Sequence, residues 1–423
     1  MGAIAPAPAP TQAHTPARSP APDLRRVPRI LLPLFVFAHF AHHVGTGGLA
    51  PLLPLLRDSF DLDYARSGLL LSAQGVALGL GQLPISALGD RLSKRAMIAC
   101  GLIGVGVMGV GISLTTSFWQ LVPLLALTGF LAATYHAPAA AYLAEVYAAT
   151  NRGRALGVHV IGGSLAFALT PVIALLVVQL TGSWRMAFLA LAVPPLLAGV
   201  LMLLVAWQGR HRTAPHGAGA GAVHAGQQVR ALAALRSIGP LVGIALAEQL
   251  LTASMFAFIP LFMVDQHGVP EDRAGLTIAL IAGVGIVAAP LGGALSDRFG
   301  RAPVLVAVTA SVGPLILLLT YAPYGWPLFL VLVLYGLSMN TRLPVLESLF
   351  ADAIPAARRA TVLGMYYFVG QESASLTMPI VGSLIDATSL VATFTLLGLT
   401  GCVLSLGLFF FRRQLVAPRP AGT

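Results

Sequence analysis

Two stretches of this chain read as copies of one motif: Pro84-Ile-Ser-Ala-Leu-Gly-Asp90-Arg91-Leu-Ser-Lys94-Arg95 and Pro290-Leu-Gly-Gly293-Ala-Leu-Ser-Asp297-Arg298-Phe-Gly300-Arg301. Asp90 and Asp297 lie 207 positions apart, and each copy is a short charged turn between two long apolar runs. Such a repeat predicts a duplicated membrane bundle rather than one large soluble core.

The composition places most of the chain in lipid. Of its residues, 57% are hydrophobic and only 9% are charged, and the mean hydropathy is +0.84. A hydrocarbon core about 30 Å thick needs roughly 20 apolar residues per helix. The sequence offers twelve such runs: Ile30–Leu56, Ser67–Gly89, Ala96–Thr115, Phe118–Val146, Ala155–Leu180, Trp184–Trp207, Ile238–Val264, Ala274–Ser296, Pro303–Tyr321, Trp326–Ala351, Thr361–Ile385 and Leu390–Phe411.

The repeat divides these runs into two sets of six. Further landmarks recur at the same offset: Gly129 with Gly336, Glu145 with Asp352, Arg152 with Arg359, and Gly157 with Gly364. We therefore expect an all-α membrane protein with twelve transmembrane helices in two pseudo-symmetric six-helix bundles. The expected parts are a disordered tail (1–28), a first bundle (29–207), a linker (208–237), a second bundle (238–413) and a short tail (414–423).

The positions of the cations predict the orientation. Twenty of the Lys and Arg residues fall in the two tails, the linker and one set of loops, and only Arg57, Arg66, Arg185 and Arg273 fall in the other set. Because Lys and Arg are retained on the cytoplasmic side, both termini should be cytoplasmic. Apart from Arg185 at the very start of one run, Arg342 is the only cation inside a predicted run.

Several classes of protein are excluded or disfavoured. The net charge of +10 is spread over short turns without interleaved aromatic residues, which favours contact with lipid headgroups over nucleic acid. No phosphate-binding Gly-rich loop or zinc-protease motif is present, so we expect no enzyme and no cofactor. His211, His216 and His224 in the linker have no compact ligand spacing.

The loop motif resembles the signature of the major facilitator superfamily, Gly-x-x-x-Asp-Arg-x-Gly-Arg. The second copy fits it from Gly293 to Arg301, and the first copy keeps Asp90, Arg91 and Arg95. Within that family, Tyr135-His136-x-Pro138 and the segment Arg152 to Gly163 are similar to the bacterial drug-efflux branch that includes fosmidomycin-resistance proteins. The resemblance covers the chain from Arg29 to Arg413.

The resemblance implies a breakable gate at the cytoplasmic side. Asp90 would face the N-terminus of the eleventh helix near Thr361, and Asp297 would face the fifth helix near Ala155, where helix dipoles favour negative charge. Glu145 would pair with Arg91, and Asp352 with Arg298. The expected gate residues are Asp90, Arg91, Arg95, Glu145, Gly293, Asp297, Arg298, Gly300, Arg301 and Asp352.

Polar groups at membrane depth are costly, so they are candidates for a substrate or proton pathway. The sequence places ten of them in the predicted helices: His39, His42, His43, Tyr135, His136, Glu248, Gln249, Asn340, Arg342 and Glu372. In the family resembled, the first, fourth, seventh and tenth helices line a central cavity, and most of these residues lie on those helices.

The roles of these groups differ by chemistry. Glu248 and Glu372 are the sharper candidates for proton carriage, because a carboxyl group in a poorly hydrated site can bind and release a proton near neutral pH. His39, His42 and His43 could contact protons or substrate, pack helices, or bind metal, and a single helix seldom supplies a closed metal shell. Arg342 needs either an acidic partner or an anionic substrate.

Together these features predict a multi-pass inner-membrane secondary transporter that works as a monomer by alternating access. Its expected partners are a small-molecule substrate, protons and the lipid bilayer, with no resident metal. Proton-coupled export of a small amphiphilic or anionic compound is the first hypothesis. Uptake or facilitated transport of an organic anion is the second, and a transport-inactive receptor or scaffold is the third. The Arg that antiporters of this family often carry in the fourth helix is Leu125 here.

Overall fold

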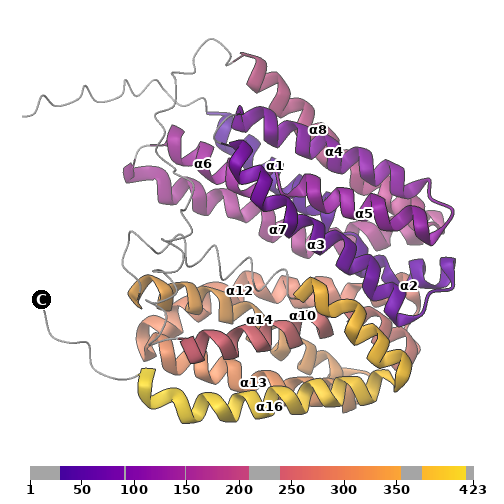
Figure 1. Ribbon diagram of the computed structural model, residues 1–423, viewed down its shortest axis with the longest axis vertical. Coiled ribbons are helices and arrows are strands. Elements are labelled where there is room, and N and C mark those ends of the chain that lie inside the picture. Colours follow the sequence, from indigo (N-terminus) through magenta and orange to yellow (C-terminus); the bar gives the residue numbers. More distant parts are fainter. Residues whose placement is uncertain (1–28, 90–91, 148, 209–238, 354–373, 416–423) are drawn as a thin grey trace, which may run out of the picture.

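The computed structural model describes residues 29–89, 92–147, 149–208, 239–353 and 374–415 (Figure 1). This part of the chain is helical and contains no strand. Its helices form two groups, one before and one after residues 209–238, and the two groups lie side by side with their long axes roughly parallel (Figure 1).

The first bundle contains α1 Leu31–Thr46, α2 Leu49–Phe60, α3 Tyr64–Gly89, α4 Lys94–Ser113, α5 Phe118–Ala132, α6 His136–Val146, α7 Ala149–Thr181 and α8 Trp184–Gln208. The second bundle contains α10 Gly239–His267, α11 Glu271–Ala274, α12 Leu276–Phe299, α13 Arg301–Tyr321, α14 Trp326–Ala353, the helix Ala374–Ala387 and α16 Leu390–Leu415.

Nine helices of the described part are long and apolar enough to cross a membrane. This agrees with the predicted all-helical membrane fold, while the count of twelve and the cytoplasmic termini remain predictions. One predicted run, Thr361–Ile385, lies partly outside the described residues.

Two runs predicted as single helices are interrupted in the structure. The first breaks at Gly47-Gly48 between α1 and α2, and the hydroxyl of Thr46 donates to the His42 carbonyl just before the break. The second breaks at residues 133–135, between α5 and α6. Pro138 has no N–H to donate to the Thr134 carbonyl, and the Thr134 hydroxyl donates to the Leu131 carbonyl.

A pair of glycine contacts repeats in both bundles. A Cβ on Gly129 would lie 1.9 Å from the Gln74 carbonyl oxygen, and a Cβ on Gly336 would lie 3.1 Å from the Ile281 carbonyl oxygen. Both residues of the second contact lie 207 positions after their counterparts, from 129 to 336 and from 74 to 281. The sequence repeat therefore corresponds to a repeated helix contact, α5 on α3 and α14 on α12.

Candidate functional site

A cluster of histidines lies at the two helix breaks of the first bundle. His39, His42 and His43 come from the end of α1, and His136 begins α6. The ring centroids of His136 lie 5.4, 4.7 and 5.2 Å from those of His39, His42 and His43, respectively. The structure thus brings together side chains that the sequence places on two separate membrane helices.

Two further aromatic residues complete this cluster. Tyr135 stacks on His39 and on His42, at centroid distances of 5.5 and 4.7 Å. His159 of α7 stacks on His39 at 4.4 Å. We name the group His39, His42, His43, Tyr135, His136 and His159 the histidine cluster.

Hydrogen bonds to backbone carbonyls fix which ring nitrogens carry protons. His39 Nδ1 lies 3.0 Å from the His159 carbonyl oxygen, and His159 Nδ1 lies 3.1 Å from the Phe35 carbonyl oxygen. Because a carbonyl only accepts, both Nδ1 atoms must donate, and in the neutral rings both Nε2 atoms carry lone pairs. The hydroxyl of Tyr135 also donates to the Phe35 carbonyl, at 3.1 Å.

The described members of the cluster differ in exposure. His39 and His42 are buried, His43 is half-buried and the His136 side chain is exposed. On the α7 side, Gly163 leaves room for the rings, because a Cβ there would lie 2.7 Å from His39 Cε1 and 3.1 Å from His43 Cδ2. His136 therefore forms the open wall of the cluster.

Glu248 is buried inside the second bundle with 0% exposure. It lies on α10, and Ser405 of α16 lies 3.3 Å from its Oε1. The Ser405 hydroxyl has a shorter bond to the Gly401 carbonyl oxygen, at 2.7 Å. Glu248 Oε2 has no hydrogen-bond partner among the described residues. The carboxyl group is therefore fully buried with incomplete hydrogen bonding.

The other predicted pathway residues of the second bundle have separate surroundings. Arg342 is buried on α14, and its charge acts on the Glu248 carboxyl group of α10. Asn340 donates to the Ile281 and Gly336 carbonyls at 3.0 and 2.8 Å, which ties α14 to α12. Gln249 is half-buried on α10, and Glu372 lies outside the described residues.

The predicted cytoplasmic gate is only partly described. Asp90 and Arg91 lie outside the described residues, as does the Asp352 side chain. Glu145 pairs with Lys94 at 2.7 Å, and Arg95 lies over the Tyr142 ring.

In the second copy of the motif, the structure shows a turn closed by its own charges. Asp297 forms an ion pair with Arg301, and Arg301 also donates to Ser296 at 2.6 Å. Gly300 has φ +93°, a conformation that favours glycine, and Gly293 is half-buried. The Arg298 guanidinium lies over the Phe299 ring.

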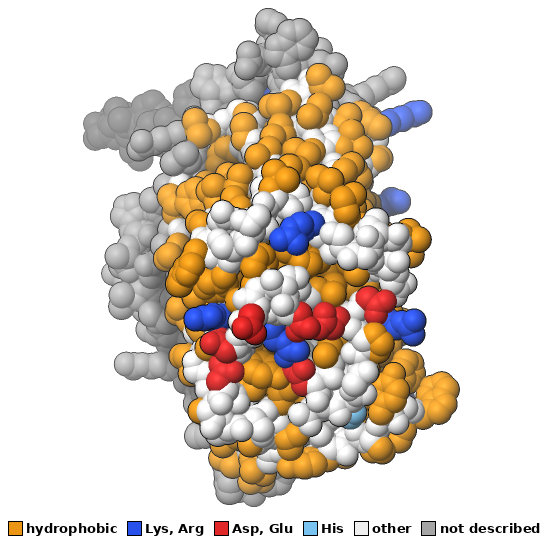
Figure 2. All heavy atoms as spheres, turned by 90° about the vertical axis from the view of Figure 1, so that its right-hand side faces the viewer, with side chains coloured by type: hydrophobic (Ala, Val, Ile, Leu, Met, Phe, Trp, Pro, Cys, Tyr) orange, Lys and Arg blue, Asp and Glu red, His pale blue; other side chains and the backbone are white. Residues whose placement is uncertain are grey.

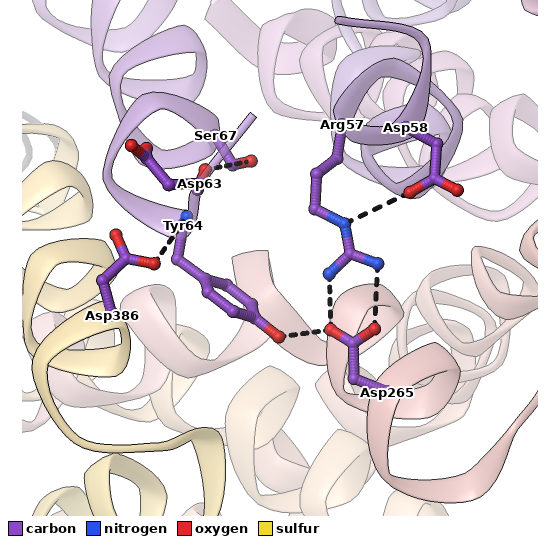
Figure 3. A network of polar contacts seen from close by, with 7 residues as sticks. All are labelled: Arg57, Asp58, Asp63, Tyr64, Ser67, Asp265 and Asp386. Carbon is purple, nitrogen blue, oxygen red and sulfur yellow. Dashed lines mark hydrogen bonds and ion pairs between the residues drawn. The ribbon is translucent and has the colours of Figure 1, made fainter. Parts of the chain in front are cut away.

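A polar network joins the two bundles at the end opposite these turns (Figure 3). Arg57 of α2 donates two hydrogen bonds to Asp265 of α10, at 2.5 and 2.8 Å. The hydroxyl of Tyr64, the first residue of α3, donates to the same carboxylate. Burial and this hydrogen bond raise the pKa of Tyr64, so it remains a neutral donor.

A second acidic group of the same network caps a helix of the other bundle. Asp386, at the end of the helix Ala374–Ala387, accepts from the backbone N–H groups of Tyr64 and Ala65 at 3.0 and 2.8 Å. These N–H groups belong to the first turn of α3 and have no partner within the helix, and a carboxylate is favourable at this positive end of the helix dipole. We name Arg57, Tyr64, Asp265 and Asp386 the seal.

Beside the seal, glycine residues allow close contact between the bundles along α3. A Cβ on Gly68 would lie 2.5 Å from the Met378 carbonyl oxygen, and a Cβ on Gly382 would lie 2.2 Å from the Tyr64 carbonyl oxygen. Leu53 of α2 also packs into the apolar core of the second bundle. Figure 2 views this end and shows acidic and basic side chains gathered in a band between more apolar regions. The bundles are therefore in direct contact here.

Sequence reasoning missed the seal and His159. In the sequence, Arg57 contributes only to the prediction of orientation, although Asp265 lies 208 positions later, close to the equivalent place in the repeat. The opposite charges at equivalent helix ends of the two halves are the sequence feature that could have predicted this ion pair. His159 was read only as part of a family resemblance, because its distance from α1 is not visible in the sequence.

Comparisons with known proteins decide the family. The model of the Major Facilitator Superfamily matches residues 35–287 and 241–423. The chain belongs to the major facilitator superfamily. Its relatives include a probable 4-methylmuconolactone transporter of Cupriavidus pinatubonensis, 25% identical over 82% of each chain. The fosmidomycin resistance protein of Escherichia coli K12 is 20% identical over 80% of this chain and 82% of its own length.

A solved structure shows the same fold. A bacterial homologue of the human lysosomal transporter Spinster, in an inward-facing and unoccupied conformation, matches with a TM-score of 0.75 and 16% identity. The match covers 92% of this chain and 98% of that one. This superfamily member is thus a multi-pass inner-membrane protein of a transporter family, and it is not an enzyme.

Proposed function

We propose that this protein is a secondary transporter that exports a small amphiphilic or anionic organic compound in exchange for protons, by alternating access. The observation that carries the proposal is the seal. It joins the two helix bundles at one end through hydrogen bonds and an ion pair, with close glycine contacts beside it. Contacts of this kind can break and reform as the bundles rock about a central site.

Glu248 is the proposed proton carrier. Its burial and the missing partner of Oε2 among the described residues make the environment sensitive to the charge of the carboxyl group. Arg342 of α14 supplies a positive charge near this carboxyl group. Loading and release of one proton would then change the electrostatics between α10 and α14, the two helices that carry these residues.

Export is proposed from family relationships and from the expected orientation. The relative from Escherichia coli is a fosmidomycin resistance protein. If the termini are cytoplasmic, as the distribution of Lys and Arg predicts, the seal closes the extracytoplasmic end, and the site of this state is reached from the cytoplasm.

Uptake of an organic anion is the second candidate, because Arg342 is a buried cation at membrane depth. Its coupling to Glu248 leaves less net positive charge for an anionic substrate. The transport-inactive receptor is disfavoured by the polar character of the seal, since a permanent contact gains more from apolar packing.

Transport by the purified full chain in proteoliposomes tests the proposal. A panel of small organic compounds is screened by counterflow, and each compound that exchanges is then tested under a pH gradient. Proton antiport predicts accumulation in the lumen when the lumen is acidic. Accumulation only with an alkaline lumen would assign symport and uptake, and an equal response to both gradients would contradict proton coupling.

A further inference from the structure

Three imidazole groups of the histidine cluster converge from two helices. His39, His43 and His136 each offer one ring nitrogen such that all three atoms lie within 4.8 Å of one another. His39 and His43 alone lie on one helix, which seldom completes a metal shell. The break between α5 and α6 adds His136 from a second helix, and three protein ligands are what an exchangeable metal site requires.

The separation of the first two ligand atoms already suits a shared metal ion. His39 Nε2 and His43 Nε2 lie 3.2 Å apart. Two nitrogens at about 2.0–2.1 Å from one ion lie about 3.3 Å apart in tetrahedral geometry and about 2.9 Å apart at a right angle. The spacing of four residues on one helix face produces this arrangement directly.

The second shell of His39 is also in place. Its Nδ1 donates to the His159 carbonyl, which leaves the lone pair on Nε2, the atom that faces His43. A ligand histidine is commonly oriented in this way by a carbonyl on its other nitrogen. Gly163 packs against the same ring and so fixes its position from the α7 side.

The third ligand can move the remaining distance. His136 is exposed, and its ring contacts are with members of the cluster, at centroid distances of 4.7 to 5.6 Å. The three ligand nitrogens lie within 4.8 Å of one another. Two ligand nitrogens of one ion lie about 3.3 Å apart, so the His136 nitrogen needs to move by about 1.5 Å. A side-chain rotation of an exposed residue supplies such a shift.

We propose that His39, His43 and His136 bind one divalent transition-metal ion of the Zn²⁺, Co²⁺ or Ni²⁺ type. These ions prefer imidazole nitrogen, whereas Mg²⁺ and Ca²⁺ prefer oxygen. The three ligands are neutral, so the bound ion keeps its positive charge and an open coordination position on the exposed side of the cluster. That position takes water or an anionic group of a substrate. The metal site goes beyond the proposed export of an organic compound and does not depend on it.

Titration with Co²⁺ tests the site in the purified full chain. The protein carries a purification tag without histidine, and the linker substitutions H211Q, H216Q and H224Q remove adventitious ligands. We expect one Co²⁺ per chain with visible absorption bands of nitrogen ligation. His43→Ala and His136→Ala should each weaken binding at least tenfold, since even loss of a second-shell partner costs about 10–100-fold.

The control is His267→Gln, at the end of α10 and outside the cluster, which should leave the affinity unchanged. Absence of Co²⁺ binding, or equal affinity in the parent and both ligand variants, overturns the site. A second measurement needs no variant: the electron paramagnetic resonance spectrum of bound Cu²⁺ should show several nitrogen ligands, and a spectrum of oxygen ligands alone overturns the proposal.

Proteoliposomes with a Zn²⁺-sensitive dye in the lumen distinguish a transported ion from a resident one. Rapid delivery of Zn²⁺ to the lumen identifies the ion as cargo, and retention at one ion per chain identifies it as resident. Flux of organic compounds in metal-free buffer is measured in parallel. Flux without metal binding rejects the metal site alone, and metal binding without any organic flux rejects the proposed export alone.

Discussion

Two sets of polar side chains lie at membrane depth, and they satisfy their hydrogen bonds differently. In the histidine cluster, backbone carbonyls of His159 and Phe35 accept from buried imidazoles. Glu248 instead keeps one oxygen without a partner among the described residues. A buried polar atom without a partner costs about 1–3 kcal/mol, and such costs are concentrated where a group changes its protonation state.

Glu248→Gln should abolish flux driven by a pH gradient while counterflow of the same compound continues. The amide keeps the size and hydrogen-bonding capacity of the side chain but cannot carry a proton. We expect at least a tenfold loss of gradient-driven flux, measured in proteoliposomes over a range of pH values. Ser405→Ala, which removes a neighbouring hydroxyl and no titratable group, serves as the matched control. Flux equal to that of the parent at every pH would reject the role of Glu248.

At the scale of helices, close glycine contacts determine how the elements pack. Gly129 allows α5 to touch the backbone of α3, and Gly336 does the same for α14 on α12, with more space. Gly157 of α7 has no neighbouring atom within 4 Å of a Cβ. The three positions therefore form a graded series.

Gly129→Ala should lower the free energy of unfolding by roughly 1–3 kcal/mol, because the added methyl group overpacks a backbone contact. Gly336→Ala should lower it less, and Gly157→Ala should leave it unchanged or slightly higher. Thermal unfolding of the purified variants in one detergent measures all three. Equal melting temperatures for the first and third variants would show that the α5–α3 contact is looser than described.

The seal predicts a second effect at this scale. Asp265→Asn removes a charge-assisted pair with Arg57, and hydrogen bonds to charged groups contribute about 1.5–3 kcal/mol. A thiol introduced by Leu53→Cys, buried between the bundles, should then react roughly tenfold faster with a membrane-impermeant reagent. Asp61→Asn, an exposed acid at the same end, is the control, and similar labelling rates in both variants would mean that the ion pair does not hold the end shut.

Much of this architecture could be predicted from the sequence, because hydropathy and the repeat act over long segments. The helical membrane fold and the family are confirmed, and the offset between Gly129 and Gly336 marks a repeated contact. The helix break before His136 depends on a local competition between Thr134 and the helix ladder, which a hydropathy pattern does not register. The contacts of Arg57 and Asp386 depend on how the bundles meet, and no local pattern encodes that.

At the scale of the whole molecule, each bundle has a largely apolar interior, and the bundles meet at the seal, where Leu53 of α2 packs into the core of the second bundle. Bundles that keep their own helix packing can rock as rigid bodies between two arrangements, so that only the contacts between them break and reform. In this account the seal is one end of an alternating-access cycle, and the charged turns at the opposite end would close when the seal opens.

Cross-linking across the seal tests this account most directly. In a background with C100S and C402S, the R57C/D265C variant is treated with a short bifunctional thiol reagent and its flux is measured in proteoliposomes. Cross-linking should stop flux, and a reductant that cleaves the linker should restore it. The T115C/R185C variant, which joins two residues within the first bundle that are in contact, should keep its flux after the same treatment. Full flux through the R57C/D265C protein while it remains cross-linked would contradict the account.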